Sequence, residues 1–411
     1  MPWQEVSTMS LREEFVQLAA VEGTNIRLLC RRFGVSPKTG YKWIQRYQQG
    51  GVEALRDQPR RPNHSPLTTP PHIEQLVIQQ RERHPAWGGR KLHKRLANLY
   101  PHLMTELPHP STITDILRRH GLLSSPLSPP HNSHKWHRFE HEAPNELWQM
   151  DFKGHFPLVK DRCHPLTVLD DHSRFSLGLR ACPNEQEQTV QDQLVWIMRL
   201  YGLPARMTMD NGAPWGCGGV SRGLNGHTAL TVWLMRLGIR ISHSRPHHPQ
   251  TQGKDERFHR TMQAELLHGR VFADLQECQR GFDRWREQYN LERPHQALGM
   301  LTPISRYRPS ERPFPEQLPR FEYQEGDIVR KVAHNGTISY QARMWGLSTA
   351  FMGCHVALRP TEHDGVLDVY FCNSLLGKLN LHSSFSEGGL GQVEHHGAPP
   401  VLALPRCKLQ D

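Results

Sequence analysis

Three proline-rich stretches limit what this chain can fold into. They cover residues 57–71, 124–144 and 301–320. Proline removes a backbone donor and disfavours helix, so each stretch is predicted to be an extended linker. The chain has 411 residues, too many for one ordinary hydrophobic core. We therefore expect a multidomain protein, with segments at 1–56, 72–123, 145–300 and 321–395 and a tail at 396–411.

The composition indicates a phosphate-binding protein. Fifty Lys and Arg stand against 40 Asp and Glu, a formal net charge of +10. Such a surplus is typical of proteins that bind nucleic acid. No run approaches the roughly 18 apolar residues that a membrane helix needs. The N-terminus, MPWQEVSTMSLREEF, has no apolar stretch of signal-peptide type. We expect a cytoplasmic, nucleoid-associated protein without membrane contact. The eight cysteines stand singly, so a zinc ribbon or redox pair is unsupported.

Residues 8–51 have the pattern of three helices. The second repeats apolar residues at helical spacing: Ile26, Leu29, Cys30 and Phe33. Gly34 ends this helix, and Ser36 followed by Pro37 begins the next. Two helices joined by a short turn predict a helix-turn-helix domain. The polar face of the third helix holds the residues expected to contact DNA: Lys38, Thr39, Lys42, Gln45 and Arg46. The alternative is a small helical bundle with a solvated face.

Residues 72–123 predict a second all-α, helix-turn-helix-like DNA-binding domain. Its helices are expected near 72–83, 89–99 and 111–120. Trp87 is interpreted as a core anchor rather than a base-stacking residue. The side chains expected to contact phosphates are Lys91, Lys94 and Arg95.

Residues 145–300 alternate strand and helix patterns. Strands are expected at 146–152, 164–170, 174–180, 205–209 and 239–241, and helices at 185–201, 228–237 and 254–268. This order predicts an α/β layer of ribonuclease H type. Asp151 lies on the first strand, Asp210 just after the fourth, and Glu256 on the last helix. Strand ends and a facing helix can bring three such carboxylates together.

The segments around these carboxylates resemble a known family. ELWQMDF (146–152), RMTMDNG (206–212) and HPQTQGKDERFHR (248–260) are similar to the integrase-core motifs of bacterial insertion-sequence transposases and retroviral integrases, the DDE recombinases. The resemblance implies that Asp151, Asp210 and Glu256 are the catalytic, metal-binding carboxylates. Asp255 beside Glu256 is the less favoured candidate. Forty-five residues lie between Asp210 and Glu256, more than is usual in the family, and a glycine-rich loop at 214–225 explains the excess.

The resemblance implies a mechanism and partners. Carboxylates favour Mg²⁺ or Mn²⁺, and two ions in each site support in-line phosphoryl transfer. The expected activity is DNA cleavage and strand transfer by a transposase. The partners would be transposon ends, target DNA and further copies of the chain in a homodimer or higher multimer. Four side chains near Glu256 are further candidates for DNA contact: Gln252, Lys254, Arg257 and Arg260.

Other interpretations stay open at this point. A non-catalytic DNA-binding regulator, or a nuclease that only hydrolyses DNA, would carry many of the same patterns. Asp170 and Asp171 are read as hairpin-turn acceptors, and Trp196 and Trp233 as core residues. His259 either donates to a phosphate or packs locally. Residues 321–395 predict a small SH3-like β-barrel, for DNA binding or multimerisation.

Overall fold

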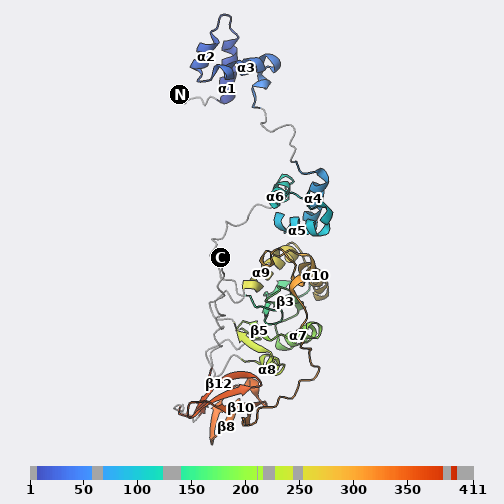
Figure 1. Cartoon of the computed structure of the whole chain (residues 1–411), viewed down its shortest axis with the longest axis vertical. Helices are drawn as coiled ribbons and strands as arrows, with labels where there is room; N and C mark the ends of the chain where they lie inside the picture. The colour runs from blue at the N-terminus through green and yellow to red at the C-terminus, as the bar shows by residue number, and fades with distance from the viewer. Residues whose placement is uncertain are drawn as a thin grey trace. The chain divides into compact units, whose positions relative to one another are not determined.

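The computed structural model describes residues 7–57, 68–123, 140–210, 212–215, 227–243, 253–382 and 390–395. Its contacts divide the chain into two compact units, Met1–Thr68 and Thr69–Asp411. Figure 1 shows the elements of each unit. In the described ranges, no helix is long and apolar enough to cross a membrane.

The first unit is a bundle of short helices: α1 (Thr8–Ala19), α2 (Ile26–Arg32), α3 (Pro37–Gly50) and the 3-10 turn η1 (Val52–Leu55). The three α-helices begin at polar caps, where Ser7, Asn25 and Ser36 accept backbone N–H groups. Helix α3 approaches α2 closely at Gly40, where an added β-carbon would stand 2.4 Å from Cys30 Sγ. The predicted helix-turn-helix arrangement is confirmed.

The second unit begins with another helical group: α4 (Pro71–Arg83), α5 (Gly89–Leu99), η2 (Pro101–Leu103) and α6 (Pro110–Arg119). Trp87 is fully buried among them and stacks on His84 with ring centroids 3.9 Å apart. The interpretation of Trp87 as a core anchor is therefore confirmed. Helices α5 and α6 meet at Gly89, where a β-carbon would lie 2.3 Å from the Pro110 carbonyl oxygen.

A six-stranded sheet forms the centre of the second unit. Its strands are β1 (Trp148–Phe152), β2 (Phe156–Pro157), β3 (Arg162–Asp170), β4 (Ser176–Cys182), β5 (Arg206–Met209) and β6 (Arg240–His243). The longer strands lie in the order β4-β3-β1-β5-β6. Strand β3 is antiparallel to β1 and β4, while β1, β5 and β6 are parallel. Strands β1, β4, β5 and β6 therefore end at one edge, as the predicted ribonuclease H-type layer requires.

Helices cover both faces of this sheet. They are α7 (Glu187–Tyr201), α8 (Ala229–Arg236), α9 (Gly253–Met262), its π-helical continuation η3 (Gln263–Leu267), α10 (Leu275–Glu287) and η4 (Gln288–Glu292). One core joins the sheet to α7 and α8, and a separate core joins it to α9 and α10. Trp233 packs against the first core. The core assignment of Trp196 is wrong, because its side chain is 37% exposed and lies under the Arg180 guanidinium.

The C-terminal strands form two sheets rather than the predicted closed barrel. The strands are β7 (Ile328–Lys331), β8 (Thr337–Tyr340), β9 (Arg343–Gly346), β10 (His355–Pro360), β11 (Val366–Phe371), β12 (Ser374–Asn380), β13 (Leu390–Gln392) and β14 (Glu394–His395), with the 3-10 turn η7 (Thr349–Phe351). The sheet orders are β14-β12-β11-β10-β7 and β13-β9-β8. No strand pairing among the described residues closes these sheets into a barrel. Their core also includes Val232 and Met235 of α8.

The proline-rich stretch 301–320 lies along the central domain and includes the turn η6 (Pro303–Arg306), shortly after η5 (Gln296–Leu298). The Arg312 side chain donates 2.9 Å hydrogen bonds to the carbonyl oxygens of Pro204 and Leu237. The Leu203 N–H donates to the Arg312 carbonyl oxygen at 2.8 Å. Extended backbone and a long cationic side chain therefore hold this stretch against the core.

Candidate active site

Asp151 and Asp210 come from neighbouring parallel strands. Asp151 lies near the end of β1, and Asp210 directly follows β5. Because β1 and β5 pair in parallel, both aspartates emerge at the same edge of the sheet. The Gly212 N–H donates to Asp210 Oδ1 at 3.1 Å, and His243 Nδ1 donates to the Asp210 carbonyl oxygen at 2.9 Å. A tight turn and the end of β6 therefore hold Asp210 in place.

The two aspartates share an acidic environment. Burial raises the pKa of Asp151 to about 7, and the negative charge of Asp210 adds to the effect. Weaker contributions come from Glu185 and Glu256. Burial also raises the pKa of Asp210, with a further contribution from Glu185. Like charges near one another disfavour ionisation, so this edge of the sheet favours a bound cation.

Glu256 and its neighbour Asp255 point in different directions from α9. Glu256 is exposed, whereas Asp255 is 1% exposed. Neither Asp255 carboxylate oxygen has a hydrogen-bond partner within the described part of the chain. Burial raises the pKa of Asp255 well above its ordinary value. Glu256 is thus the carboxylate that α9 presents outward.

The three carboxylates do not stand in ion-binding geometry. Within the residues that the structure describes, no group of three His, Cys, Asp or Glu side chains could hold a metal ion. The negative charges of Asp210 and Glu256 both raise the pKa of Asp151. The three carboxylates therefore interact electrostatically, but they do not surround one position at which an ion could contact all three.

Glu185 is a residue that the sequence did not single out. It follows β4, whose carboxyl end lies at the same edge as those of β1 and β5. His164 Nδ1 lies 2.9 Å from Glu185 Oε1. The local signal was available, because an acidic residue just after a strand is a candidate for a strand-end site. The strand order that brings Glu185 beside the aspartates was not readable from the local pattern.

His259 packs locally. Its Nε2 lies 2.9 Å from Thr167 Oγ1, and its Nδ1 lies 4.0 Å from Asp151 Oδ2. Burial lowers the pKa of His259 to about 4, so the ring is neutral at pH 7. A neutral, half-enclosed imidazole supports the strand that carries Asp151.

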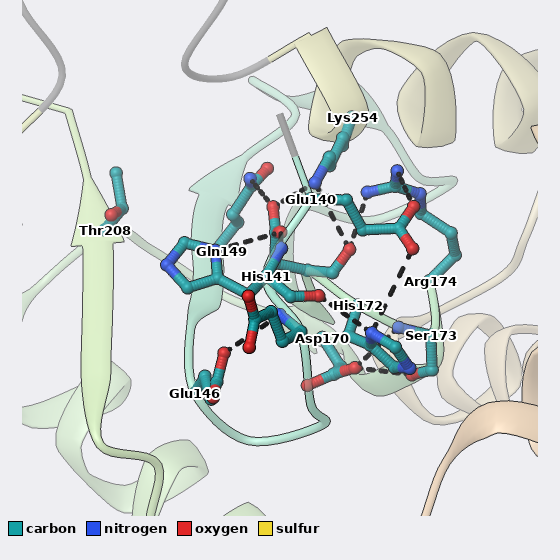
Figure 2. A network of polar contacts seen from close by, with 12 residues as sticks. Glu140, His141, Glu146, Gln149, Asp170, His172, Ser173, Arg174, Thr208 and Lys254 are labelled. Atoms are coloured by element: carbon teal, nitrogen blue, oxygen red, sulfur yellow. Dashed lines mark hydrogen bonds and ion pairs between the residues drawn. The ribbon is translucent and has the colours of Figure 1, made fainter. Parts of the chain in front are cut away.

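The turn-acceptor role is confirmed for Asp170, whereas the Asp171 carboxylate accepts hydrogen bonds from other segments. Asp170 accepts hydrogen bonds from the N–H groups of Ser173 and Asn145, at 2.8 and 2.7 Å. The carboxylate of Asp171 accepts hydrogen bonds from Gln149 Nε2 and from the His141 N–H, and both of these residues belong to the polar network of Figure 2. Asp170 therefore stabilises the β3–β4 turn, whereas the Asp171 carboxylate connects the end of β3 to Gln149 of β1 and to His141.

Two of the four DNA-contact candidates near Glu256 lie on the outside of α9. Arg257 and Arg260 are exposed and lie one and four residues beyond Glu256, so they form a basic rim beside it. Lys254 turns inward and pairs with Asp171. Gln252 lies outside the described residues.

The candidates in the helical segments differ in their surroundings. On α3, Lys38, Lys42 and Gln45 are exposed, while Thr39 and Arg46 are half-buried. The cationic groups of Lys42 and Arg46 lie 4.9 and 5.1 Å from the Trp43 ring. This face is therefore basic and open to solvent.

On α5, two of the three predicted DNA contacts are already paired. Lys91 Nζ lies 3.8 Å from Glu265 Oε1, and Arg95 donates to Glu292 at 2.7 Å. Burial lowers the pKa of Lys91 to about 8. Lys94 is half-buried. The basic face of α5 is thus partly neutralised by carboxylates of the same chain.

Family models match several segments of the chain. Residues 11–63 match a helix-turn-helix domain, and residues 39–117 match a homeodomain-like domain. Residues 141–249 and 237–303 each match an integrase core domain. Residues 327–385 match the C-terminal domain of the IS481 family of transposases. The resemblance to bacterial insertion-sequence transposases with an integrase-type core is therefore confirmed.

Three proteins that are similar to this chain come from mobile elements. An uncharacterized protein of insertion element IS407 from Burkholderia multivorans is 27% identical over 39% of this chain and 54% of its own length. An uncharacterized protein of insertion element IS476 from Xanthomonas euvesicatoria is 24% identical over 58% of this chain and 66% of its own. A putative transposase of IS5376 from Geobacillus stearothermophilus is 22% identical, over 56% and 57%. The chain thus spans between about half and two thirds of these relatives.

Proposed function

We propose that this chain is a DNA transposase that binds the ends of its element and catalyses Mg²⁺-dependent strand cleavage and strand transfer. The observation that carries the proposal is the shared acidic edge of Asp151 and Asp210, which lies inside the segment matching an integrase core. The negative charge of Glu256 on α9 also raises the pKa of Asp151. Acidic strand ends beside a basic helix suit a reaction at a DNA phosphate.

The donor set fits a hard divalent cation. Asp151, Asp210 and Glu256 offer only carboxylate oxygens, which Mg²⁺ and Mn²⁺ prefer. A cation would also offset the repulsion that raises the pKa of Asp151. Asp151 and Asp210 would hold the metal from the sheet, and Glu256 would complete the site from α9. Two such ions, when bound, activate an attacking oxygen and stabilise the leaving one.

The chain's own residues bind and orient the DNA. Arg257 and Arg260 flank Glu256 and are placed to hold phosphates. With water as the nucleophile, the element end is cut. With the resulting 3′-hydroxyl as the nucleophile, the end is joined to target DNA. Metal binding requires the ionised form of Asp151, whose pKa is about 7 without metal, so Mg²⁺ affinity should increase as the pH rises toward that value.

Binding of the element ends falls to the helical segments. Helix α3 would enter the major groove, with Lys42 and Arg46 against phosphates and Gln45 near base edges. Joining two ends requires two active sites, so we propose a homodimer or a larger multimer on DNA.

A cell-free assay tests this function. The purified chain is incubated with Mg²⁺ and DNA that includes the sequences flanking its gene, and joined products are measured. We expect joining, and we expect Asp210→Asn to abolish it while end binding persists. Asp192→Asn, an exposed change on α7, is the control and should behave as wild type. Nicking without joining would indicate a nuclease, and binding without either would indicate a regulator.

A further inference from the structure

The start of helix α9 is held by an ion pair that the proposed chemistry does not itself use. The Lys254 ammonium pairs with the carboxylate of Asp171 and also donates to the Asp171 carbonyl oxygen at 3.2 Å. The two side chains are 19% and 4% exposed. In Figure 2, Lys254 reaches from α9 toward Gln149 and the polar cluster around it.

Asp171 is a firm anchor because several groups hold it. Its carboxylate accepts hydrogen bonds from the His141 N–H at 3.0 Å and from Gln149 Nε2 at 2.8 Å. Its own N–H donates to the Leu147 carbonyl oxygen at 3.0 Å. Gln149 is two residues before Asp151 on β1, so both side chains lie on one face of that strand. The anchor for Lys254 is therefore tied to the strand that carries Asp151.

The pairing fixes the rotation of the first turn of α9. Residues two apart on a helix point in nearly opposite directions, because each residue advances about 100°. Lys254 faces inward to Asp171, so Glu256 must face outward, and it is exposed. Asp255 between them is buried.

A second tether lies on the far side of Glu256. His259 Nε2 is 2.9 Å from Thr167 Oγ1, and that hydroxyl donates to the Asp151 carbonyl oxygen at 2.9 Å. Glu256 thus lies between two points at which α9 is tied to the β1–β3 pair. A shift of either point would move Glu256 relative to Asp151.

We propose that the Asp171–Lys254 ion pair is a positioning device that sets the direction and distance of Glu256 relative to Asp151 and Asp210. Lys254 then acts through Glu256 and does not contact a DNA phosphate, which was its predicted role. The inference rests on the proposed function, because it gives Glu256 a task in metal binding.

Lys254→Met tests the device in the full-length chain. Loss of an outer-shell partner typically weakens a metal site by about 10-fold or more. We expect the Mg²⁺ concentration for half-maximal joining to rise by about that factor, while end binding keeps its affinity and salt dependence. Amide hydrogen exchange should quicken in residues 254–260 and stay unchanged in α10. Lys254→Arg, which keeps the charge, should restore the Mg²⁺ requirement.

Two further variants keep the test decisive. Arg359→Met breaks a comparable pair with the buried Asp327 in the C-terminal sheets, and it should leave the Mg²⁺ requirement at the wild-type value. Asp171→Asn, which removes the charge and keeps an acceptor, replaces Lys254→Met if the latter fails to fold, and should raise the requirement likewise.

Three results would overturn the proposal. They are an unchanged Mg²⁺ requirement in a folded variant, exchange that quickens equally across the whole domain, and weaker end binding with a smaller salt slope. The last would make Lys254 a phosphate contact. Failure of the proposed function is distinguishable, because the wild-type chain would then show no joining, whereas the exchange measurement needs no activity.

Discussion

The Thr167 hydroxyl on β3 donates a 2.9 Å hydrogen bond to the carbonyl oxygen of Asp151 on β1. Thr167 is also the partner of Asp151 in the register of the two strands. The side chain that supports the backbone of Asp151 is therefore in contact with His259 of α9 as well. These hydrogen bonds connect both β3 and α9 to Asp151, the residue proposed to bind metal. A shift of either element should therefore move Asp151.

Asp151→Asn should stabilise the metal-free protein at high pH. The pKa of Asp151 rises from 3.8 to about 7 on folding, so ionising it in the folded state is unfavourable. The stability contributed by the neutral acid is complete below pH 3.8 and is lost as the pH rises to about 7. Each unit of pKa corresponds to about 1.4 kcal/mol. We expect the variant to melt several degrees above wild type at about pH 8 and level with it at about pH 4.

Thermal melts with and without Mg²⁺ check this expectation. Mg²⁺ should raise the melting temperature of wild type and have little effect on Asp151→Asn, because the ion binds the folded state through that carboxylate. Asp192→Asn, exposed on α7, should follow wild type at both pH values. Equal melting of Asp151→Asn and wild type throughout would show that folding does not raise the pKa of Asp151.

Glu256→Gln and Asp255→Asn should separate the two neighbouring acids of α9. Glu256 is exposed, so its change should leave the melting temperature unaltered and reduce joining by more than about 100-fold, beyond the effect of losing an outer-shell partner. Asp255 is buried, burial raises its pKa well above the ordinary value, and asparagine has nearly its shape. Joining by Asp255→Asn should remain measurable. The reverse pattern, with joining lost at Asp255 and kept at Glu256, would assign the ligand to the buried carboxyl.

Local patterns predicted much of the fold and of the candidate site. The alternation around Asp151 placed it on a strand, and the break after Met209 placed Asp210 at a strand end, because both signals lie within a few residues. The helix expected at 254–268 is observed as α9 and its continuation η3. These features depend on periodicity, which a sequence states directly.

Contacts between distant segments could not be read in this way. Lys254 looked like a phosphate contact, because its partner Asp171 is 83 residues away. Glu185 reaches the aspartates only through the order in which β4, β3, β1 and β5 pair. Alternating strands at 321–395 indicate a sheet, but whether sheets close depends on edge pairings that alternation does not encode.

Gly89→Ala should destabilise the α5–α6 pair, and Gly88→Ala should not. A β-carbon at Gly89 would stand 2.3 Å from the Pro110 carbonyl oxygen, which is backbone and cannot swing away. At Gly88 nothing lies within 4 Å. Overpacking of this kind costs about 1–3 kcal/mol. Amide exchange in α5 and α6 of the full chain should quicken for Gly89→Ala alone, and equal exchange in both variants would mean that the helices separate without cost.

Lys42→Ala and Lys91→Ala should differ in the salt dependence of end binding. Lys42 is exposed on α3, so its loss removes one phosphate contact and should lower the slope of log affinity against log salt by about 1. Lys91 is paired with Glu265, which also accepts a 2.9 Å hydrogen bond from Arg293. Its charge is already used within the chain, so Lys91→Ala should leave the slope unchanged. Fluorescence anisotropy over a salt series measures both. Should Lys91→Ala lower the slope as much as Lys42→Ala, the Lys91–Glu265 pair must open when DNA binds, and α5 would then be a DNA-binding face after all.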